Sequence, residues 1–253
     1  MLKKTLLIAL FLLVAFSATQ GFVPLAQAQP AAVRIITFSG YKWDVRTGTG
    51  GPGPNSWSSS NVRVDANGYL HLKITNQSGQ WYSSEVTSEK FFGFGKYQFQ
   101  VIGRVDQFDP NIVLGLFNYP TPVIGPDGTN EIDIEFSHWG NAAYPIGNYT
   151  VWPAVPGPAQ HSHSFPFSLG SANTTQRFTW GSKKIIFQSL HGFTDGSLGQ
   201  YAGWAFQPAS YLRYIPQHAM QVHFNLWLFQ GQPPVNGQPV EIILKSFKFT
   251  PAP

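Results

Sequence analysis

The 253-residue sequence contains no cysteine, so no disulfide bond can stabilise the fold and a lipid-anchored lipoprotein is excluded. A chain of this length can instead bury a substantial hydrophobic core. Charged residues are also scarce, at 11% of the chain, and the formal net charge is only +4. This charge is too small and too scattered to indicate nucleic-acid binding. Beyond residue 28 the sequence also lacks an amphipathic helical pattern.

Aromatic residues are abundant by contrast, at 15% of the chain, and include eight Trp. A composition rich in aromatics and poor in charge favours a neutral, polar ligand that binds against ring faces, and sugars are the obvious class. A buried β-sandwich also uses many aromatic side chains, so each ring has a structural alternative. The candidates for sugar stacking are Trp81, Tyr82, Trp139, Tyr149 and Trp152.

The N-terminal segment has the features of a secretory signal peptide. Lys3 and Lys4 precede an apolar run over residues 5–16, and Ala26-Gln27-Ala28 fits the small-x-small cleavage rule. The alternative is an N-terminal membrane anchor, but the run is short for a span of about 20 residues. We expect cleavage after Ala28, a secreted or periplasmic protein, and no stable membrane association afterwards.

The remaining residues, 29–253, predict a single all-β domain. Short alternating stretches recur at 69–74, 96–101, 183–187, 222–229 and 240–249. Gly, Pro, Asn and Ser fill the segments between them, and Asn67-Gly68 is a strong hairpin signal. We find no internal repeat and no composition break. The pattern predicts a sandwich or jelly roll of two antiparallel sheets.

One of these strands has two distinct faces. Val222, Phe224, Leu226 and Leu228 form an apolar face, which we expect to lie in the core. The opposite face carries His223, Asn225, Trp227 and Phe229, and its mixed chemistry favours a ligand side. Packing of Trp227 in the core remains an alternative.

The most informative segment is Glu131-Ile132-Asp133-Ile134-Glu135. In a strand its three carboxylates point to one face, while Ile132, Ile134 and Phe136 point to the other. A row of like charges costs stability, yet glycosidic bond cleavage needs two carboxyl groups, and a third can tune their pKa values. The alternative is a solvated acidic edge that guards against aggregation.

These residues and their surroundings resemble glycoside hydrolase family 16, whose signature is E-x-D-x-E. The resemblance extends to residues 92–97 and 115–119, to Arg177-Phe178-Thr179-Trp180 with Ile185-Ile186-Phe187, to Asn225-Leu226-Trp227 and to residues 240–250. It covers roughly residues 57–250. It implies a concanavalin A-like jelly roll with a concave substrate cleft.

The resemblance also implies roles for the triplet. Glu131 would be the nucleophile, Glu135 the general acid/base and Asp133 the assisting carboxylate. Retention of anomeric configuration would follow, with the two working carboxyl groups about 5–5.5 Å apart. Because Cα atoms at i and i+4 of a flat strand lie about 13 Å apart, we expect this strand to curve.

Further residues are implied as substrate contacts. Glu85 sits where licheninases place a substrate-binding Glu, although their usual Arg is Thr87 here. His138 and Trp139 follow the motif and predict a subsite of their own. The other expected contacts lie on the strands beside the motif or on the strand over residues 222–229, and they are Asn118, Tyr119, Asn148, Tyr149, Asn225 and Trp227.

We expect no metal and no cofactor. His161-Ser162-His163 has no nearby Cys or acidic partner, which favours a polar loop over a metal site. Lys245 stands where many licheninases keep an Asp that ligates structural Ca²⁺, so the resemblance does not extend to that site. We also expect a monomer.

The sequence therefore supports a secreted endo-acting glycoside hydrolase whose partner is a polysaccharide. A β-1,3/1,4- or β-1,3-glucan is the expected substrate, while xyloglucan and an algal galactan remain open. A non-catalytic sugar-binding module on the same fold is the alternative from another class, because a fold alone does not fix function. A transglycosylase is a variant of the first hypothesis. An intact triplet favours the enzyme.

Overall fold

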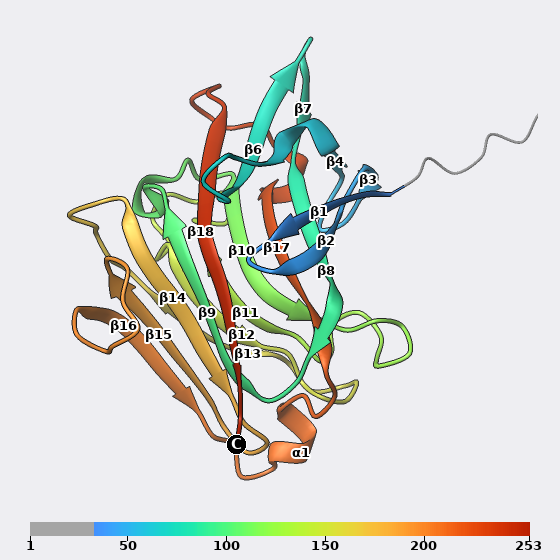
Figure 1. Cartoon of the computed structure of the whole chain (residues 1–253), viewed down its shortest axis with the longest axis vertical. Helices are drawn as coiled ribbons and strands as arrows, with labels where there is room; N and C mark the ends of the chain where they lie inside the picture. The colour runs from blue at the N-terminus through green and yellow to red at the C-terminus, as the bar shows by residue number, and fades with distance from the viewer. Residues whose placement is uncertain (1–32) are drawn as a thin grey trace, which may run out of the picture. The chain divides into compact units, whose positions relative to one another are not determined.

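The computed structural model describes residues 33–253, which form one compact unit. The predicted signal peptide, residues 1–28, lies outside the described residues. Two antiparallel sheets of eight strands each pack face to face, and Figure 1 shows them from the edge, as a left-hand and a right-hand layer. The predicted all-β jelly-roll sandwich is confirmed.

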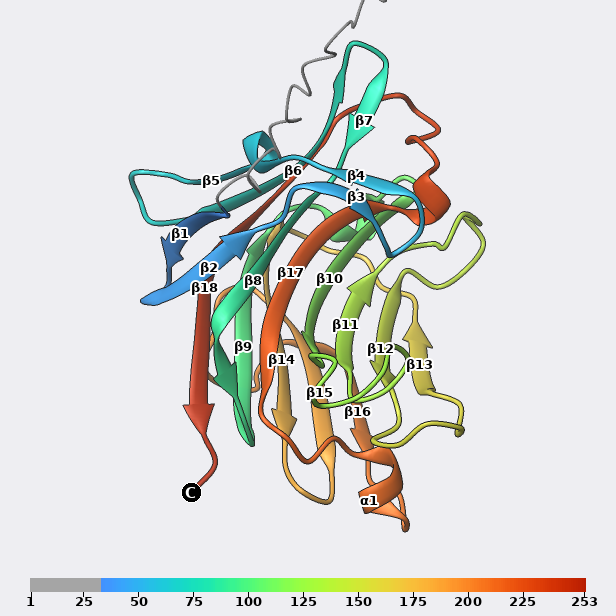
Figure 2. The same ribbon diagram turned by 90° about the vertical axis from the view of Figure 1, so that its right-hand side faces the viewer.

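The first sheet carries the acidic motif. Figure 2 shows its strands side by side, with β17 and β10 visibly curved along their length. Every neighbouring pair in this sheet is antiparallel. In spatial order its strands are β1 (Arg34–Phe38), β2 (Tyr41–Val45), β8 (Ser84–Phe92), β17 (Met220–Leu228), β10 (Ile112–Tyr119), β11 (Ile132–Phe136), β12 (Gly147–Val151) and β13 (His161–Phe165).

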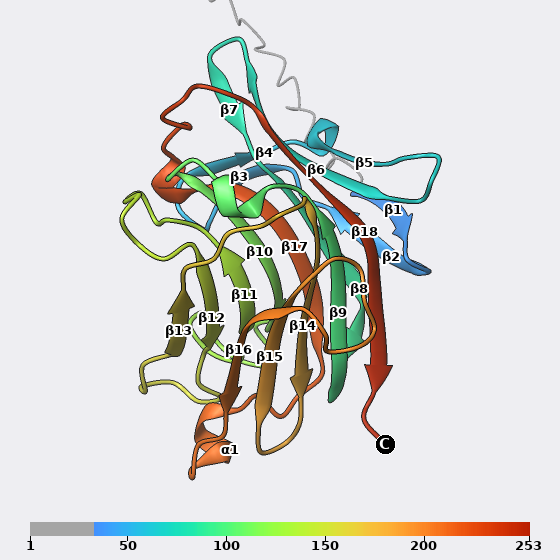
Figure 3. The same ribbon diagram turned by 90° about the vertical axis from the view of Figure 1, so that its left-hand side faces the viewer.

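The second sheet covers the inner side of the first and faces the viewer in Figure 3. In spatial order its strands are β16 (Gln200–Phe206), β15 (Ile185–His191), β14 (Asn173–Trp180), β9 (Gly95–Ile102), β18 (Val240–Pro251), β6 (Leu70–Gln77) and β5 (Val62–Val64), and β7 (Gln80–Tyr82) pairs with β6. The remaining elements are short: the hairpin of β3 (Gly48–Gly50) and β4 (Asn55–Trp57), α1 (Tyr211–Tyr214), and the 3₁₀ turns η1 (Ser59–Asn61), η2 (Val105–Gln107) and η3 (Phe229–Gly231).

The core lies between the two sheets and is built from the apolar rows of their strands. Val222, Phe224, Leu226 and Leu228 of β17 all lie in it, as their alternation predicts. The Phe224 ring meets the ring of Phe99 from β9 edge-on, with centroids 5.6 Å apart. Since full burial of one such side chain contributes about 1.5–3 kcal/mol, this core can hold the fold without disulfides.

Stacked aromatic rings join the two sheets at the edge formed by β13 and β16. His163 of β13 stacks on Trp204 of β16 with ring centroids 6.0 Å apart, and Tyr149 stacks on Phe187 at 4.9 Å. The expectation of a polar loop at residues 161–163 is therefore wrong, because alternate side chains of this segment pack against the second sheet as a strand. Within residues 33–253 no group of three or more acidic, His or Cys side chains has a metal-binding arrangement.

The predicted strands agree with the structure apart from shifts of a few residues at their ends. Asn67-Gly68 forms the turn between β5 and β6, where Gly68 has a φ of 78° and its N–H donates to the Asp65 carbonyl at 3.0 Å. In the described part of the chain, no helix has both the length and the apolar character needed to span a membrane.

Candidate functional site

The acidic triplet lies on the face of the first sheet that points away from the core, which we call the outer face. Ile132, Ile134 and Phe136 of β11 are fully buried in the core, so the alternation places the carboxyl groups opposite them. Asp133 is 2% exposed, and Glu131 and Glu135 are half-buried. The predicted division of this strand into an apolar and an acidic face is confirmed, and β11 lies inside the sheet, so the triplet is not a solvated edge.

Burial raises the pKa of all three carboxyl groups, and repulsion by neighbouring carboxylates adds to this at Glu131 and Asp133. Burial raises the pKa of Glu135 to about 7, although a hydrogen bond with Asn148 opposes this. For Glu131, burial is the largest cause and the negative charge of Glu135 the next. Asp133 is raised by burial and then by the charges of its two neighbours. The site therefore retains protons near neutral pH.

The carboxyl groups of Asp133 and Glu131 influence each other's pKa. Their hydrogen bond raises the pKa of Asp133 and lowers that of Glu131, which means that Asp133 is the donor. Asp133 Oδ1 is buried and has no hydrogen-bond donor opposite it among the described residues. The other oxygen, Oδ2, accepts a hydrogen bond from Trp152 Nε1 at 3.0 Å. Trp152 follows β12, and its backbone N–H donates to the Glu131 carbonyl at 2.9 Å.

One row of residues crosses the outer face at the level of Glu135. The antiparallel register places Asn148 on one side of Glu135 and Gly115 on the other, and Asn225 lies beyond Gly115. A Cβ at Gly115 would lie 2.4 Å from Asn225 Oδ1, so only glycine fits there without a shift. Asn225 Oδ1 is buried and has no hydrogen-bond partner among residues 33–253, which leaves it available to a ligand.

A second row crosses the sheet at the level of Asp133. Thr150 lies on one side of Asp133, and Phe117, His223 and Thr87 follow on the other. Next to this row Tyr119 lies on the outer face and donates from its hydroxyl to Asp127 Oδ1 at 2.6 Å.

Two of the expected substrate contacts point into the core instead. Asn118 pairs with Ile132 and Val222, both of which are core residues, and it is fully buried. Tyr149 pairs with Ile134 and shares a hydrogen bond with Ser189 of the second sheet at 2.7 Å. Both predictions are corrected, because alternation along β10 and β12 gives the outer face to their neighbours.

Asn148 and Trp227 lie on the outer face as expected. Asn148 Oδ1 accepts a hydrogen bond from Ser164 Oγ at 2.8 Å, and its amide donates to Thr150 Oγ1 at 2.9 Å. Trp227 is 6% exposed and forms a small apolar cluster with Trp57 and Val113. Trp227 therefore lies on the expected ligand side of the strand, but it is packed among apolar side chains there, outside the main core.

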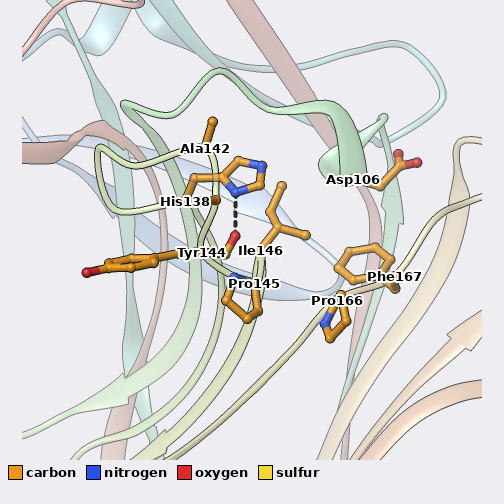
Figure 4. Close-up of a pocket in the computed structure, with 9 residues that line it drawn as sticks. Asp106, His138, Ala142, Tyr144, Pro145, Ile146, Pro166 and Phe167 are labelled. Atoms are coloured by element: carbon orange, nitrogen blue, oxygen red, sulfur yellow. Dashed lines mark hydrogen bonds between the residues drawn. The ribbon is translucent and has the colours of Figure 1, made fainter.

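The loop after β11 sends its two expected contacts in different directions. Trp139 adopts a left-handed conformation with φ 52° and packs against Trp227 and Phe229 on the outer face. His138 instead lines a surface pocket of about 420 Å³ whose lining includes none of the triplet. In Figure 4 its Nδ1 hydrogen-bonds to the Tyr144 carbonyl at 2.7 Å. The two residues therefore do not form one subsite.

Comparisons with solved structures agree with this architecture. The β-glucanase of Bacillus licheniformis superposes with a TM-score of 0.60 at 21% identity, covering 88% of this chain and 100% of that one. A family 16 endo-glucanase from Bacteroides ovatus has a TM-score of 0.56 at 14% identity, covering 82% and 94%. The chain has the jelly-roll fold of the family 16 glucanases.

The same fold also occurs in a protein described as an immunostimulatory antigen and pseudo β-1,3-glucanase of Mycobacterium tuberculosis. It has a TM-score of 0.62 at 21% identity, covering 83% of this chain and 91% of that one. No family model and no curated protein matches the sequence. The family 16 likeness of this chain is therefore a likeness of fold.

The family 16 resemblance implies that Glu85 contacts substrate, but both of its carboxylate oxygens have protein partners in the structure. It is 5% exposed, Arg46 Nη1 donates to its Oε2 at 2.7 Å, and His223 Nδ1 lies 3.0 Å from its Oε1. Burial raises the pKa of Glu85, but His223 and Arg46 together lower it below its ordinary value. Thr87 lies 3.0 Å from the same His223 nitrogen.

Sequence patterns did not predict the contacts that Arg46, Trp152 and Asp127 make at the site. Trp152 was a stacking candidate, whereas its indole N–H holds Asp133. Arg46 directly follows β2, and its guanidinium lies 4.2 Å from the centre of the Trp57 ring, so the partner of Glu85 comes from a segment far away in sequence. No local pattern marks such a residue, because its partners lie on other strands.

Proposed function

We propose that the protein is a secreted, endo-acting glycoside hydrolase that cleaves a β-1,3/1,4- or β-1,3-linked glucan with retention of configuration. The observation that carries the proposal is the triplet at and just before β11, whose three carboxyl groups share the outer face and have raised pKa values. Two carboxyl groups that flank a glycosidic bond are the usual requirement for its hydrolysis. The family 16 glucanase fold supports the same reaction class.

In the proposed reaction Glu135 is the general acid. A pKa of about 7 keeps a large part of this group protonated near neutral pH, so it can donate a proton to the glycosidic oxygen as that bond breaks. Glu131 attacks the anomeric carbon and forms a glycosyl ester. Glu135, now ionised, takes a proton from the water that hydrolyses this ester.

Asp133 prepares the nucleophile. Glu131 must be ionised to attack, although burial and the charge of Glu135 favour its neutral form. The proton that Asp133 donates to Glu131 in their hydrogen bond lowers the pKa of Glu131 and thus favours the ionised nucleophile. Trp152 holds Asp133 in place through its indole N–H.

The test is release of reducing ends by the purified protein from barley mixed-linkage glucan, lichenan, laminarin, xyloglucan and agarose. We expect turnover of a β-glucan and its loss, by a factor of 10³ or more, in Glu131→Gln, since the variant has no nucleophile. Turnover that Glu131→Gln retains would contradict the assignment. Retention is checked by following the anomer that is first released in nuclear magnetic resonance spectra.

A second candidate function is a sugar-binding module without turnover. The specific reason to keep it is that a protein with this fold is described as a pseudo β-1,3-glucanase. Binding of a glucan with no release of reducing ends by the unmodified chain would favour this candidate. Products longer than the substrate would instead favour transglycosylation, in which a sugar hydroxyl replaces water.

A further inference from the structure

A histidine that is held by its Nδ1 atom faces the proposed substrate beside the triplet. Glu85 Oε1 and Thr87 Oγ1 each lie 3.0 Å from His223 Nδ1. Both groups come from β8, and an ionised carboxylate only accepts hydrogen bonds. Nδ1 therefore carries a proton that it donates on this side, and the other nitrogen, Nε2, is the ring atom that can hydrogen-bond to a ligand.

The neighbours of His223 hold its ring in place through ring contacts and through Nδ1, not through Nε2. The imidazole stacks on Phe117 with ring centroids 5.1 Å apart, and Tyr119 meets it edge-on at 5.8 Å. The side chain is 13% exposed on the outer face. Among residues 33–253 no group hydrogen-bonds to Nε2, although Nδ1 has two partners. A polar atom that is oriented but unpaired on this face is suited to a ligand.

His223 lies in the same row as Asp133, two strands away. β10 separates β11 from β17, as Figure 2 shows, and strands lie about 4.8 Å apart, so the spacing is roughly 10 Å. A polysaccharide that crosses the strands at the triplet therefore passes over His223 at a neighbouring sugar unit.

We propose that His223, held by Glu85 and through it by Arg46, determines specificity at this neighbouring sugar through a hydrogen bond between Nε2 and an unsubstituted hydroxyl. The ligand class is a neutral saccharide with a free hydroxyl at that position. Glu85 then positions His223 and does not contact the sugar. The inference rests on the proposed function, since it takes the triplet as the place where the chain crosses.

The test is calorimetric binding of cello- and laminari-oligosaccharides, from disaccharide to hexasaccharide, to Glu131→Gln protein with and without His223→Phe. Phe keeps the ring stack but has no acceptor. We expect about a ten-fold loss of affinity, the equivalent of one hydrogen bond, which begins only at the length that reaches residue 223. His223→Gln, which offers both a donor to Glu85 and an acceptor, should restore part of it.

The matched control is His163→Phe, the same change in the aromatic stack between β13 and β16, far from the outer face; it should bind every oligosaccharide as the parent does. Equal affinity of His223→Phe and parent at all lengths would overturn the inference, and so would an equal loss at all lengths, since that indicates a structural role. Binding of no oligosaccharide by the parent would also overturn it. The proposed function is decided separately, by turnover of the unmodified chain.

Discussion

Gly115 offers a direct test of the row of residues that joins Glu135 to Asn225. In Gly115→Ala the new Cβ would lie 2.4 Å from Asn225 Oδ1 and 3.2 Å from the Phe117 ring. Overpacking of this kind costs about 1–3 kcal/mol, and the alanine returns up to about 1 kcal/mol through the unfolded chain. We therefore expect a net loss of about 1–2 kcal/mol in the free energy of unfolding.

Removing the partner should remove most of this cost. Asn225→Ala deletes the oxygen that the new methyl group meets, and because that oxygen has no hydrogen-bond partner within residues 33–253, the single change should cost little stability. In the Asn225→Ala background Gly115→Ala should be nearly neutral. The two changes should thus couple by about 1–2 kcal/mol in a double-mutant cycle.

The assay is urea unfolding of the four proteins of the cycle, with an unchanged m value as the sign that only stability differs. Gly93→Ala is the control, since a Cβ there has only Ala219 within 4 Å, at 3.9 Å. Equal costs of Gly115→Ala with and without the Asn225 side chain would refute the row geometry. A Gly115→Ala protein as stable as Gly93→Ala would refute it as well.

Three further predictions concern the triplet. Asn148→Ala removes a hydrogen bond that lowers the pKa of Glu135, so the basic limb of the pH–kcat profile, expected near pH 7, should move to higher pH. Trp152→Phe removes the donor to Asp133 Oδ2, so kcat/KM should fall about ten-fold or more, whereas an unchanged value would exclude a role for this contact. Because the pKa of Glu135 is raised from 4.5 to about 7 by folding, its ionisation destabilises the fold increasingly between those values and fully above them. Glu135→Gln should therefore raise the melting temperature more at pH 8 than at pH 4. The difference corresponds to at most about 3 kcal/mol in the free energy of unfolding, and equal shifts at both pH values would contradict this.

Periodicity was sufficient to predict those parts of the fold that depend on one strand at a time. The faces of β11 and β17 follow from alternation alone, because each has one uniformly apolar row. The turn at Asn67-Gly68 follows from local backbone chemistry, since Gly68 needs a positive φ.

The errors at Asn118 and Tyr149 have different causes. Asn118 continues the row of Leu114 and Leu116 on β10, so alternation alone gives its place in the core. Tyr149 lies on a short strand that is buried on both faces, and no apolar row marks the core side there. An aromatic ring with a polar hydroxyl fits either face, and here Ser189 of the other sheet satisfies it.

Residues brought in from distant strands are beyond this kind of prediction. The contact of Arg46 with Glu85 joins positions 39 residues apart, and that of Glu85 with His223 joins positions 138 residues apart. Their meeting depends on the strand order of the sheet, which neither alternation nor turn signals specify. The family 16 resemblance placed Glu85 at the site as a substrate contact, whereas in the structure Glu85 contacts Arg46 and His223.

The two halves of the outer face use their acidic groups in opposite ways. On β8 the negative charge of Glu85 is matched by Arg46 and by the His223 hydrogen bond, which lower its pKa and keep it ionised. At the triplet no cation of the described chain is among the causes that shift the pKa values, so burial raises all three, and repulsion adds to it at Glu131 and Asp133. The two arrangements are incompatible at one position. A cation beside Glu135 would lower its pKa and remove its proton, and a Glu85 without Arg46 would no longer be held ionised as a partner for His223. Because β17 and β10 separate Glu85 from the triplet, and Gly115 lies between Glu135 and Asn225, one sheet can hold proton-bearing acids for the proposed chemistry beside a fixed histidine for recognition.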